Sequence, residues 1–484
     1  MAEMIFMLIV ILGAPGAFVV FAARSAPDDR HGPVLWHYLV LGTLLTVIGL
    51  VVMGLTAWYT HEDVHYDDFG SAMTFLAAML GGTLFLLGLG PFIPWLLGVL
   101  GRHAVRLPPP IRLAVRDVAG NRTRTAPAIA TALISTALAI ALMIISFATT
   151  AQKRVKYHPE ARSGALLVRE FSTNEAAAVH AAIRHELPGV PIVQSYREHG
   201  PAEIELEIPN VELPFRDGMA PDTYVGDQAL LRYLTGDPAT PYDENTAVVV
   251  TTDESKVVTA TLLIQHDSVG GRRPVSKTIP AIGVSPTEPD VQGLFIPAKV
   301  MRDLGYQLEQ TALIVDPSSH RTSAAEQERI GRRLGDAAVT YVERGFQAPA
   351  GWIVFATVLI AIAFYGALIA PGRTAATSRS RRVLLRTGAS TAALRLFSAC
   401  RTGFSAACGT ALGAVAGCSI GLLLAWPATT SSGWEDSTPR VAFDTPWLTI
   451  SALVAGLPIL TAAIAALAPT GTTTRSGATE KTSH

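Results

Sequence analysis

The stretch IRLAVRDVAGNRTRTAPAIATALISTALAIALMIIS, residues 111–146, places four arginines directly before an unbroken apolar segment. Its first part predicts an amphipathic helix, because apolar residues recur at helical spacing from Ile111 to Val118. Such a helix lies in the plane of a membrane interface with its arginines toward anionic headgroups. Gly120 then breaks the helix, and Pro127 is tolerated in the first turn of a second helix that enters the bilayer. The predicted polar face and its continuation comprise Arg112, Arg116, Asp117, Asn121, Arg122 and Arg124.

A charged flank without protein contacts is the alternative interpretation of residues 111–146.

The composition of the chain supports a membrane protein, since 49% of the 484 residues are hydrophobic and only 16% are charged. In soluble domains, roughly a quarter of the residues are charged. The net charge of -1 gives no reason to expect nucleic acid as a partner. Three cysteines within one apolar segment, Cys400, Cys408 and Cys418, indicate no disulfide framework.

Seven stretches have about the 20 mainly apolar residues that a spanning helix needs. The first resembles a signal peptide in length, but Glu3 stands where such a peptide has basic residues, so we interpret it as a retained span. The third contains Pro91 and Pro94, which predict a kink. The seven predicted spans are residues 4–22, 34–59, 71–100, 127–149, 351–370, 396–426 and 447–468.

The arginines between the spans predict their orientation, because short basic connections are retained on the cytoplasmic side. Six arginines follow the third span and six follow the fifth, whereas the connections on the opposite side are acidic or neutral. The N-terminus is then outside, the C-terminus inside, and the polar region 151–349 outside the plasma membrane. Strand-like and helix-like segments alternate irregularly in that region, which favours one large extracytoplasmic α+β domain between helices four and five.

The expected strands of this domain are GALLVRE, VPIVQSY, AEIELEI, NTAVVVTT, KTIPAIGV, TALIVD and VTYVE. Its expected helices are NEAAAVHAAIRHEL after a Ser172 or Asn174 cap, PAKVMRDLGY, and SAAEQERIGRRLGD after a Ser323 cap.

In the sixth span, a glycine at every fourth position predicts a face on which another helix packs closely, with a pore or lipid groove as the alternative. These glycines are Gly409, Gly413, Gly417 and Gly421.

One predicted outer loop contains residues of the types that bind metal ions. Acidic loops of this kind are more commonly only solvated, so we assign no metal. Its candidate residues are His61, Glu62, Asp63, His65, Asp67 and Asp68. The chain has no G-x-x-x-x-G-K-[ST] and no H-E-x-x-H, which excludes the usual nucleotide and zinc-protease motifs. The middles of the spans carry no acidic or basic residue, which argues against an ion-coupled carrier.

Four segments in order resemble one family: RLAVRDVAGNRTRTAPAIATALISTALAIAL at 112–142, YVERGF at 341–346, RRVLLRTGAS at 381–390 and TPWLTISALVAGLPILTAAIAAL at 445–467. They are similar to the FtsX-like permease family of MacB- and LolC-type ABC transporters, and to the C-terminal half of large actinobacterial two-unit permeases. LGLGP at 87–91 resembles the linker spans of those proteins. Together these matches extend over about three quarters of the chain.

The resemblance implies a permease that moves its outer domain by mechanotransmission while a separate P-loop ATPase binds ATP and Mg²⁺, so no enzyme activity and no bound cofactor are expected of this chain. The cytoplasmic coupling helix would be residues 379–390, although the acidic residue often found ahead of this segment is replaced by arginines. Substrates would be lipid-linked molecules, peptides or drugs, and partners would include membrane lipid and a second permease, identical or different. The implied ATPase contacts are Arg379, Arg381, Arg382, Arg386, Gly388, Ala389 and Ser390.

A transmembrane signalling module that controls a cell-wall hydrolase or senses an antibiotic is the rival function, and a degenerate structural half-permease is a third. Large relatives have two permease units, so this chain is either a half-size permease or begins upstream of its first residue. The expected division is three spans in 1–100, an amphipathic helix in 101–126, helix four in 127–150, the outer domain in 151–349, helix five in 350–371, the coupling segment in 372–395, helices six and seven in 396–468, and a disordered tail in 469–484.

Overall fold

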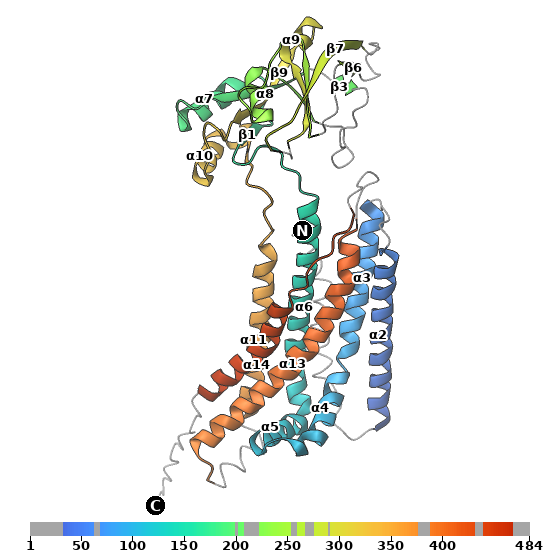
Figure 1. The fold of residues 1–484 in the computed structure, drawn as a ribbon. Helices are drawn as coiled ribbons and strands as arrows, with labels where there is room; N and C mark the ends of the chain where they lie inside the picture. The colour runs from blue at the N-terminus through green and yellow to red at the C-terminus, as the bar shows by residue number, and fades with distance from the viewer. Residues whose placement is uncertain are drawn as a thin grey trace, which may run out of the picture. The chain divides into compact units, whose positions relative to one another are not determined.

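The computed structural model describes residues 32–61, 68–198, 202–207, 222–252, 259–266, 275–288, 291–375, 388–430 and 439–467. The chain divides into a helical unit, Met1–Val155 with Ala348–His484, and a sheet unit, Lys156–Gln347 (Figure 1). The sheet unit nearly coincides with the predicted domain 151–349. It begins slightly later because the preceding helix continues to Val155.

The described helical unit contains six helices that are long and apolar enough to span a membrane. They correspond to the six predicted spans from residue 34 onward, whereas the predicted span 4–22 lies outside the described residues. The seven-helix topology therefore stays a prediction. The six helices are α2 (Gly32–Tyr59), α3 (Asp68–Leu89), α6 (Arg122–Val155), α11 (Gly351–Ala375), α13 (Thr391–Ala428) and α14 (Trp447–Leu467).

The third predicted span, 71–100, is wrong in its extent. Helix α3 ends at Leu89, and a separate helix α4 (Phe92–His103) begins after Pro91. Proline has no N–H to donate to the preceding turn, so the helix ends before Pro91 and a new helix begins after it. Helix α4 buries Ile93 and Leu97, and a short turn, η1 (Ala104–Arg106), follows it.

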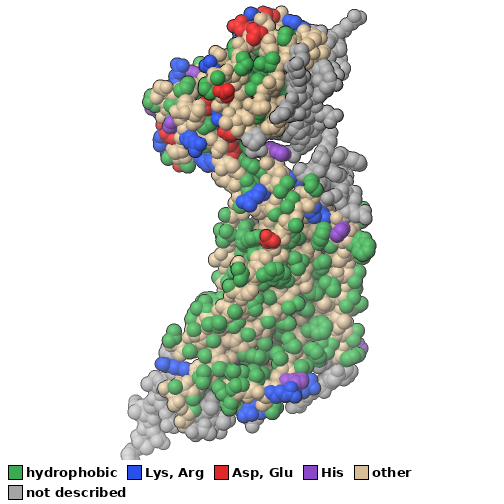
Figure 2. Space-filling view, in the orientation of Figure 1, with side chains coloured by type: hydrophobic (Ala, Val, Ile, Leu, Met, Phe, Trp, Pro, Cys, Tyr) green, Lys and Arg blue, Asp and Glu red, His purple; other side chains and the backbone are tan. Residues whose placement is uncertain are grey.

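Helix α6 forms the centre of the helical unit. Of its most apolar 18 residues 94% are buried, against 17% for α2 and α14. It packs on α11 and α13, while α2 packs on α3 and both contact α13. Large apolar side chains of α2, α11 and α14 are instead exposed, and Figure 2 shows hydrophobic side chains over most of this unit. Exposed apolar surface of this extent is stable only where lipid or another protein surrounds it.

The sheet unit has ten described strands in the order β10-β1-β9-β2-β4-β8-β5-β7-β6-β3. β4 pairs with β8 and β5 with β7 in parallel, and the other pairs are antiparallel. All seven predicted strands are present, and β4, β6 and β8 were not predicted. The strands are β1 (Leu166–Arg169), β2 (Ile192–Glu198), β3 (Ala202–Glu207), β4 (Thr223–Gly226), β5 (Ala247–Val250), β6 (Thr259–His266), β7 (Val275–Val284), β8 (Gly293–Pro297), β9 (Leu308–Val315) and β10 (Val339–Val342).

Helices α7 (Ala176–Glu186) and α10 (Ala324–Leu334) cover one face of β1, β9 and β10 in a single apolar core. Ser323 caps α10 and exchanges hydrogen bonds with Glu326 in a capping box, as the sequence predicts. The predicted Ser172 or Asn174 cap is wrong, since α7 follows Glu175 and has no side-chain cap. Helix α8 (Gln228–Thr235), which was not predicted, and α9 (Ala298–Asp303) complete the unit.

Candidate functional site

Helix α5 (Pro109–Gly120) is the predicted amphipathic helix, and it packs on α4 and α13. It buries Ala114, Val115 and Val118, while Arg116 is exposed. Ile111, which the sequence predicts on the same apolar face, is 36% exposed beside an exposed Leu113. Basic side chains gather at this end of the helical unit in Figure 2. The exposed ones near α4 and α5 are Arg102, His103, Arg106 and Arg116.

Asp117 does not share the exposed face with Arg116, contrary to the sequence prediction. Its side chain is 2% exposed, and its Oδ2 lies 3.1 Å from Nε of Arg401, whose side chain is 3% exposed. Arg401 belongs to α13, the helix that begins where the predicted coupling segment ends. A buried ion pair thus joins the interface helix to the helix after the coupling segment.

The corner between α5 and α6 is held by its own side chains. Nδ2 of Asn121 donates to the carbonyl oxygen of Asp117 at 2.9 Å, and the Thr125 hydroxyl donates to the carbonyl of Val118 at 3.2 Å. The first bond adds to the one that the Asp117 carbonyl accepts from the Asn121 N–H, and the second satisfies the Val118 carbonyl at the end of α5. These bonds connect the end of α5 to the start of α6. The side chain of Arg124 is not described.

The four glycines of α13 form a seam with α6. A Cβ added at Gly409 would lie 2.6 Å from Cβ of Ala132, and one at Gly413 would lie 2.6 Å from the carbonyl oxygen of Leu133. At Gly417 and Gly421 the nearest atoms of α6 would be at 2.6 and 2.9 Å. Contacts this short show that the backbones of α6 and α13 approach closely along three helical turns.

Most of the predicted coupling segment lies outside the described residues, including Arg379, Arg381, Arg382 and Arg386. Of its described residues, Gly388 has φ +74°, a left-handed conformation that suits glycine. Ser390 then caps α13 by accepting a hydrogen bond from the Ala393 N–H at 3.3 Å. The predicted break and cap before the sixth span are thus both confirmed.

The candidate metal loop also lies mainly outside the described residues, which include only His61 and Asp68 of its six members. His61 stacks on Trp426 with ring centroids 4.8 Å apart, and Arg440 lies over the same indole at 4.9 Å. Among the described residues, no group of three metal-ligand side chains occurs.

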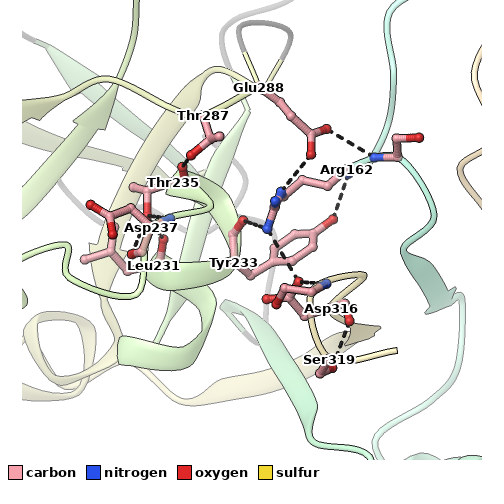
Figure 3. Close-up of polar contacts among 11 residues, drawn as sticks. Arg162, Leu231, Tyr233, Thr235, Asp237, Thr287, Glu288, Asp316 and Ser319 are labelled. Carbon is pink, nitrogen blue, oxygen red and sulfur yellow. Dashed lines mark hydrogen bonds and ion pairs between the residues drawn. The ribbon is translucent and has the colours of Figure 1, made fainter. Parts of the chain in front are cut away.

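In the sheet unit, Arg162 connects four segments that are distant in sequence (Figure 3). Its Nε lies 3.2 Å from Glu288, its Nη1 lies 3.4 Å from Asp316, and its backbone N–H donates to the Tyr233 hydroxyl at 3.1 Å. The Arg162 side chain is 10% exposed. Since an unpaired charge at that depth is unfavourable, the two carboxylates hold the start of the sheet unit against the segment before β8 and the turn after β9, and Tyr233 connects it to α8.

Replacing Arg162 by methionine should destabilise the sheet unit by about 3 kcal/mol, since it leaves Asp316 and Glu288 without their cation. Because Glu288 is 36% exposed, the loss should fall at the low end of the range for buried pairs. Urea-dependent proteolysis of the full chain in detergent, followed on fragments of residues 156–347, measures this change. Arg232→Met, at an exposed position of α8, is the control and should change stability by less than about 0.5 kcal/mol. Equal stability of the two variants would show that the ion pairs of Arg162 do not stabilise the sheet unit.

Tyr233 makes the stability of this unit dependent on pH, because burial raises the pKa of its hydroxyl to about 12. The pKa of an unfolded tyrosine is about 10. Above pH 10 the unfolded chain loses this proton first, so the stabilising contribution is present below pH 10 and is lost as the pH rises to about 12.

We expect the stability difference between wild type and Tyr233→Phe to decrease by about 1 kcal/mol from pH 9 to pH 11. Urea unfolding followed by near-ultraviolet circular dichroism at each pH tests this. A difference that stays constant over this range would contradict the assignment.

Glu343 lies between the entry and exit segments of the sheet unit and is 1% exposed. Its carboxylate accepts hydrogen bonds from the Tyr157 hydroxyl, from the Glu160 N–H at 3.1 Å and from the Gly345 N–H at 2.7 Å. A fourth bond comes from the Tyr341 hydroxyl at 3.1 Å. Burial, followed by the bond to Glu343, raises the pKa of Tyr157 above its usual value, so it remains a donor at physiological pH. Hydrogen bonds to the Glu343 carboxylate therefore join the segment that follows α6 to the segment that precedes α11.

A cleft of about 1120 Å³ opens on the sheet face opposite α7 and α10. Its floor is formed by β1, β2, β4 and β9, and one of its walls is the segment from Lys156 to Ala161. That wall is fixed on one side by Glu343 and on the other by Arg162. Lys156, the first residue of this wall, directly follows the last residue of α6.

No protein-family model matches this chain, and no curated protein matches it.

Sequence reasoning did not find the cleft, the Asp117–Arg401 pair or Arg162. The available signal was the segment YVERGF at 341–346. In the structure, Tyr341 and Gly345 of this segment donate hydrogen bonds to its Glu343 carboxylate. Phe346 packs edge-on against Tyr157, with ring centroids 5.7 Å apart.

Proposed function

We propose that the chain is the permease subunit of an ABC transporter, in which a separate ATPase moves the sheet unit through the helices. The single observation that carries this proposal is the course of α6. This 34-residue helix starts at the corner with α5, contacts the glycine face of α13 along its length, and ends one residue before the wall of the cleft. Along the chain, this helix joins the basic end of the helical unit to Lys156, the first residue that lines the cleft.

The energy source must be a partner, because the sequence has no phosphate-binding loop of the usual kind. ATP and Mg²⁺ would bind that partner. Its docking surface would include the arginines of residues 379–390 and the exposed basic residues of α4 and α5. Motion of that segment would reach α13 directly, then α5 through Asp117–Arg401, and α6 through the glycine seam. A second permease chain, identical or different, would complete the transporter.

We further propose that the basic end is cytoplasmic and the sheet unit extracytoplasmic in the plasma membrane. Arg102, Arg106, Arg116 and Arg395 are exposed at the proposed cytoplasmic end. Lys153 and Arg154 lie at the opposite end of α6, but they precede a long domain, and such domains cross the membrane largely regardless of charge. We expect an impermeant maleimide, added to whole cells, to label a single cysteine introduced at Ser319 and not one introduced at Arg106.

Purification of the tagged chain from its native membrane in mild detergent tests the partner. A P-loop ATPase should accompany the wild type and be lost when Arg381, Arg382 and Arg386 are changed to glutamate. Arg232→Glu, an exposed charge reversal in the sheet unit, is the control and should retain it. If no ATPase accompanies any form of the chain, the permease proposal fails.

A signalling role is the second candidate, and the location of the cleft in the sheet unit favours it. A ligand bound there would act on α6 through the wall segment without crossing the membrane. Reconstituted vesicles containing the chain and its ATPase distinguish the two roles. Ligand-stimulated ATP hydrolysis with movement of the ligand supports transport, and stimulation without movement supports signalling.

A further inference from the structure

We propose that the cleft of the sheet unit binds a small amphiphilic anion, a molecule with an apolar or aromatic body and one phosphate or carboxylate group. This inference deepens the proposed function by assigning a ligand class, and it rests on that function only for the use made of binding. The cleft is formed by the sheet unit alone, so binding needs no ATPase.

The size of the cleft suits such a ligand. Pockets for small molecules usually measure about 300 to 1,000 Å³, and this cleft measures about 1120 Å³. It is bounded by the sheet floor, the wall of residues 156–161, and Tyr233 and Leu234 of α8. A molecule of drug size can therefore fit in this cleft.

Arg169 and Arg197 supply the proposed anion-binding groups, and Lys156 also lines the cleft. Nη2 of Arg169 bonds Glu160 at 2.6 Å, but its Nε is buried and has no hydrogen-bond partner among the described residues. Arg197 is exposed on β2, and the described part of the chain offers it no ion pair. The Arg169 side chain is 38% exposed, so another part of its guanidinium can be reached from the cleft. Arginine recognises phosphate and carboxylate through paired N–H donors.

Acidic side chains also line the cleft, namely Glu160, Glu170 and Asp222. Glu160 pairs with Arg169, and no ion pair among the described residues joins any of the three to Arg197. The exposed Glu170 stands at the rim with φ +63°, which is unusual for a residue other than glycine. Such strain is concentrated at functional positions, and here it directly follows Arg169.

Apolar and aromatic groups supply the surface for the body of the ligand. Leu167 and Ile314 form part of the floor, and Phe171, Tyr196 and Tyr224 line the sides. Aromatic side chains bury large areas with little loss of conformational freedom, which suits them to hold flat or branched apolar groups. The combination of this surface with two arginines selects an amphiphilic anion over a sugar or a simple inorganic ion.

The test uses the full chain in dodecyl maltoside and two fluorescent probes, 2-naphthyl phosphate and the neutral 2-naphthyl glucoside. Equilibrium dialysis against detergent alone corrects for binding to micelles. We expect saturable binding of the phosphate, at least tenfold weaker binding of the glucoside, and at least tenfold weaker phosphate binding in Arg169→Gln and in Arg197→Gln. Arg232→Gln, outside the cleft, should bind like the wild type.

Binding of the phosphate that is unaffected by both cleft substitutions, or no saturation below about 10 mM, would overturn the proposal. Arg169→Gln also removes the bond to Glu160, so its thermal midpoint is measured in parallel, and Arg197→Gln breaks no described contact. Native mass spectrometry separates two sources of the anion. Phospholipid carried by the wild type and lost in Arg197→Gln identifies a membrane lipid, whereas a lipid-free chain that binds the probe identifies a soluble ligand. A failed ATPase pull-down leaves these results unchanged, so the two proposals fail separately.

Discussion

Replacing Gly413 by leucine should abolish recovery of folded protein. A Cβ at this position would lie 2.6 Å from the carbonyl oxygen of Leu133 and 2.8 Å from Cβ of Thr136. The obstructing oxygen belongs to the backbone of the central helix and cannot rotate away. Separating α6 from α13 to admit the side chain would open the contact that also buries Gly409, Gly417 and Gly421. Size-exclusion chromatography of detergent extracts should show aggregated or no protein.

A smaller side chain at Gly413 should have a smaller effect on stability. Gly413→Ala should cost about 1 to 3 kcal/mol, the usual range for overpacking, and lower the thermal midpoint. Gly456 of α14 is the matched control, because a Cβ there meets nothing within 4 Å. Gly456→Ala should leave stability unchanged or raise it by up to about 1 kcal/mol, since alanine favours the helix. A Gly413→Ala variant as stable as Gly456→Ala would mean that α6 and α13 do not pack through this face.

Breaking the Asp117–Arg401 pair should be the second largest effect. In Arg401→Met the Asp117 carboxylate remains buried at 2% exposure without its cation, which typically costs about 3 to 5 kcal/mol. Titration with sodium dodecyl sulfate in mixed micelles measures the free energy of unfolding. Arg395→Met, at an exposed position on the same helix, should change it by less than about 0.5 kcal/mol.

The double variant Asp117→Leu with Arg401→Met distinguishes the role of the pair. Replacing a buried ion pair by apolar side chains is often neutral or stabilising, so the double variant should recover most of the stability. If the pair transmits motion, ATP hydrolysis by the partner should nevertheless lose its dependence on ligand in this stable variant. Retained coupling would show that the glycine seam alone carries the motion.

The sequence by itself determined the features that arise from local pattern. Hydrophobic length predicts the six described spans, because a helix must satisfy its backbone within itself in lipid. A four-residue spacing places the glycines of α13 on one face, and Ser323 and Ser390 cap their helices through bonds to residues three positions away. The seven predicted strands also follow from local composition.

Only the tertiary structure decided which residues meet across the chain. The helical period of α5 puts Asp117 beside arginines on a polar face, and nothing local reveals that Arg401 of α13 meets it in the interior. Arg162 and Glu343 likewise acquire their roles from partners in distant segments, and the cleft exists because those partners fix residues 156–161 over the sheet. Periodicity is a property of one helix or strand, whereas a buried charge is stable only with a partner that the fold brings to it.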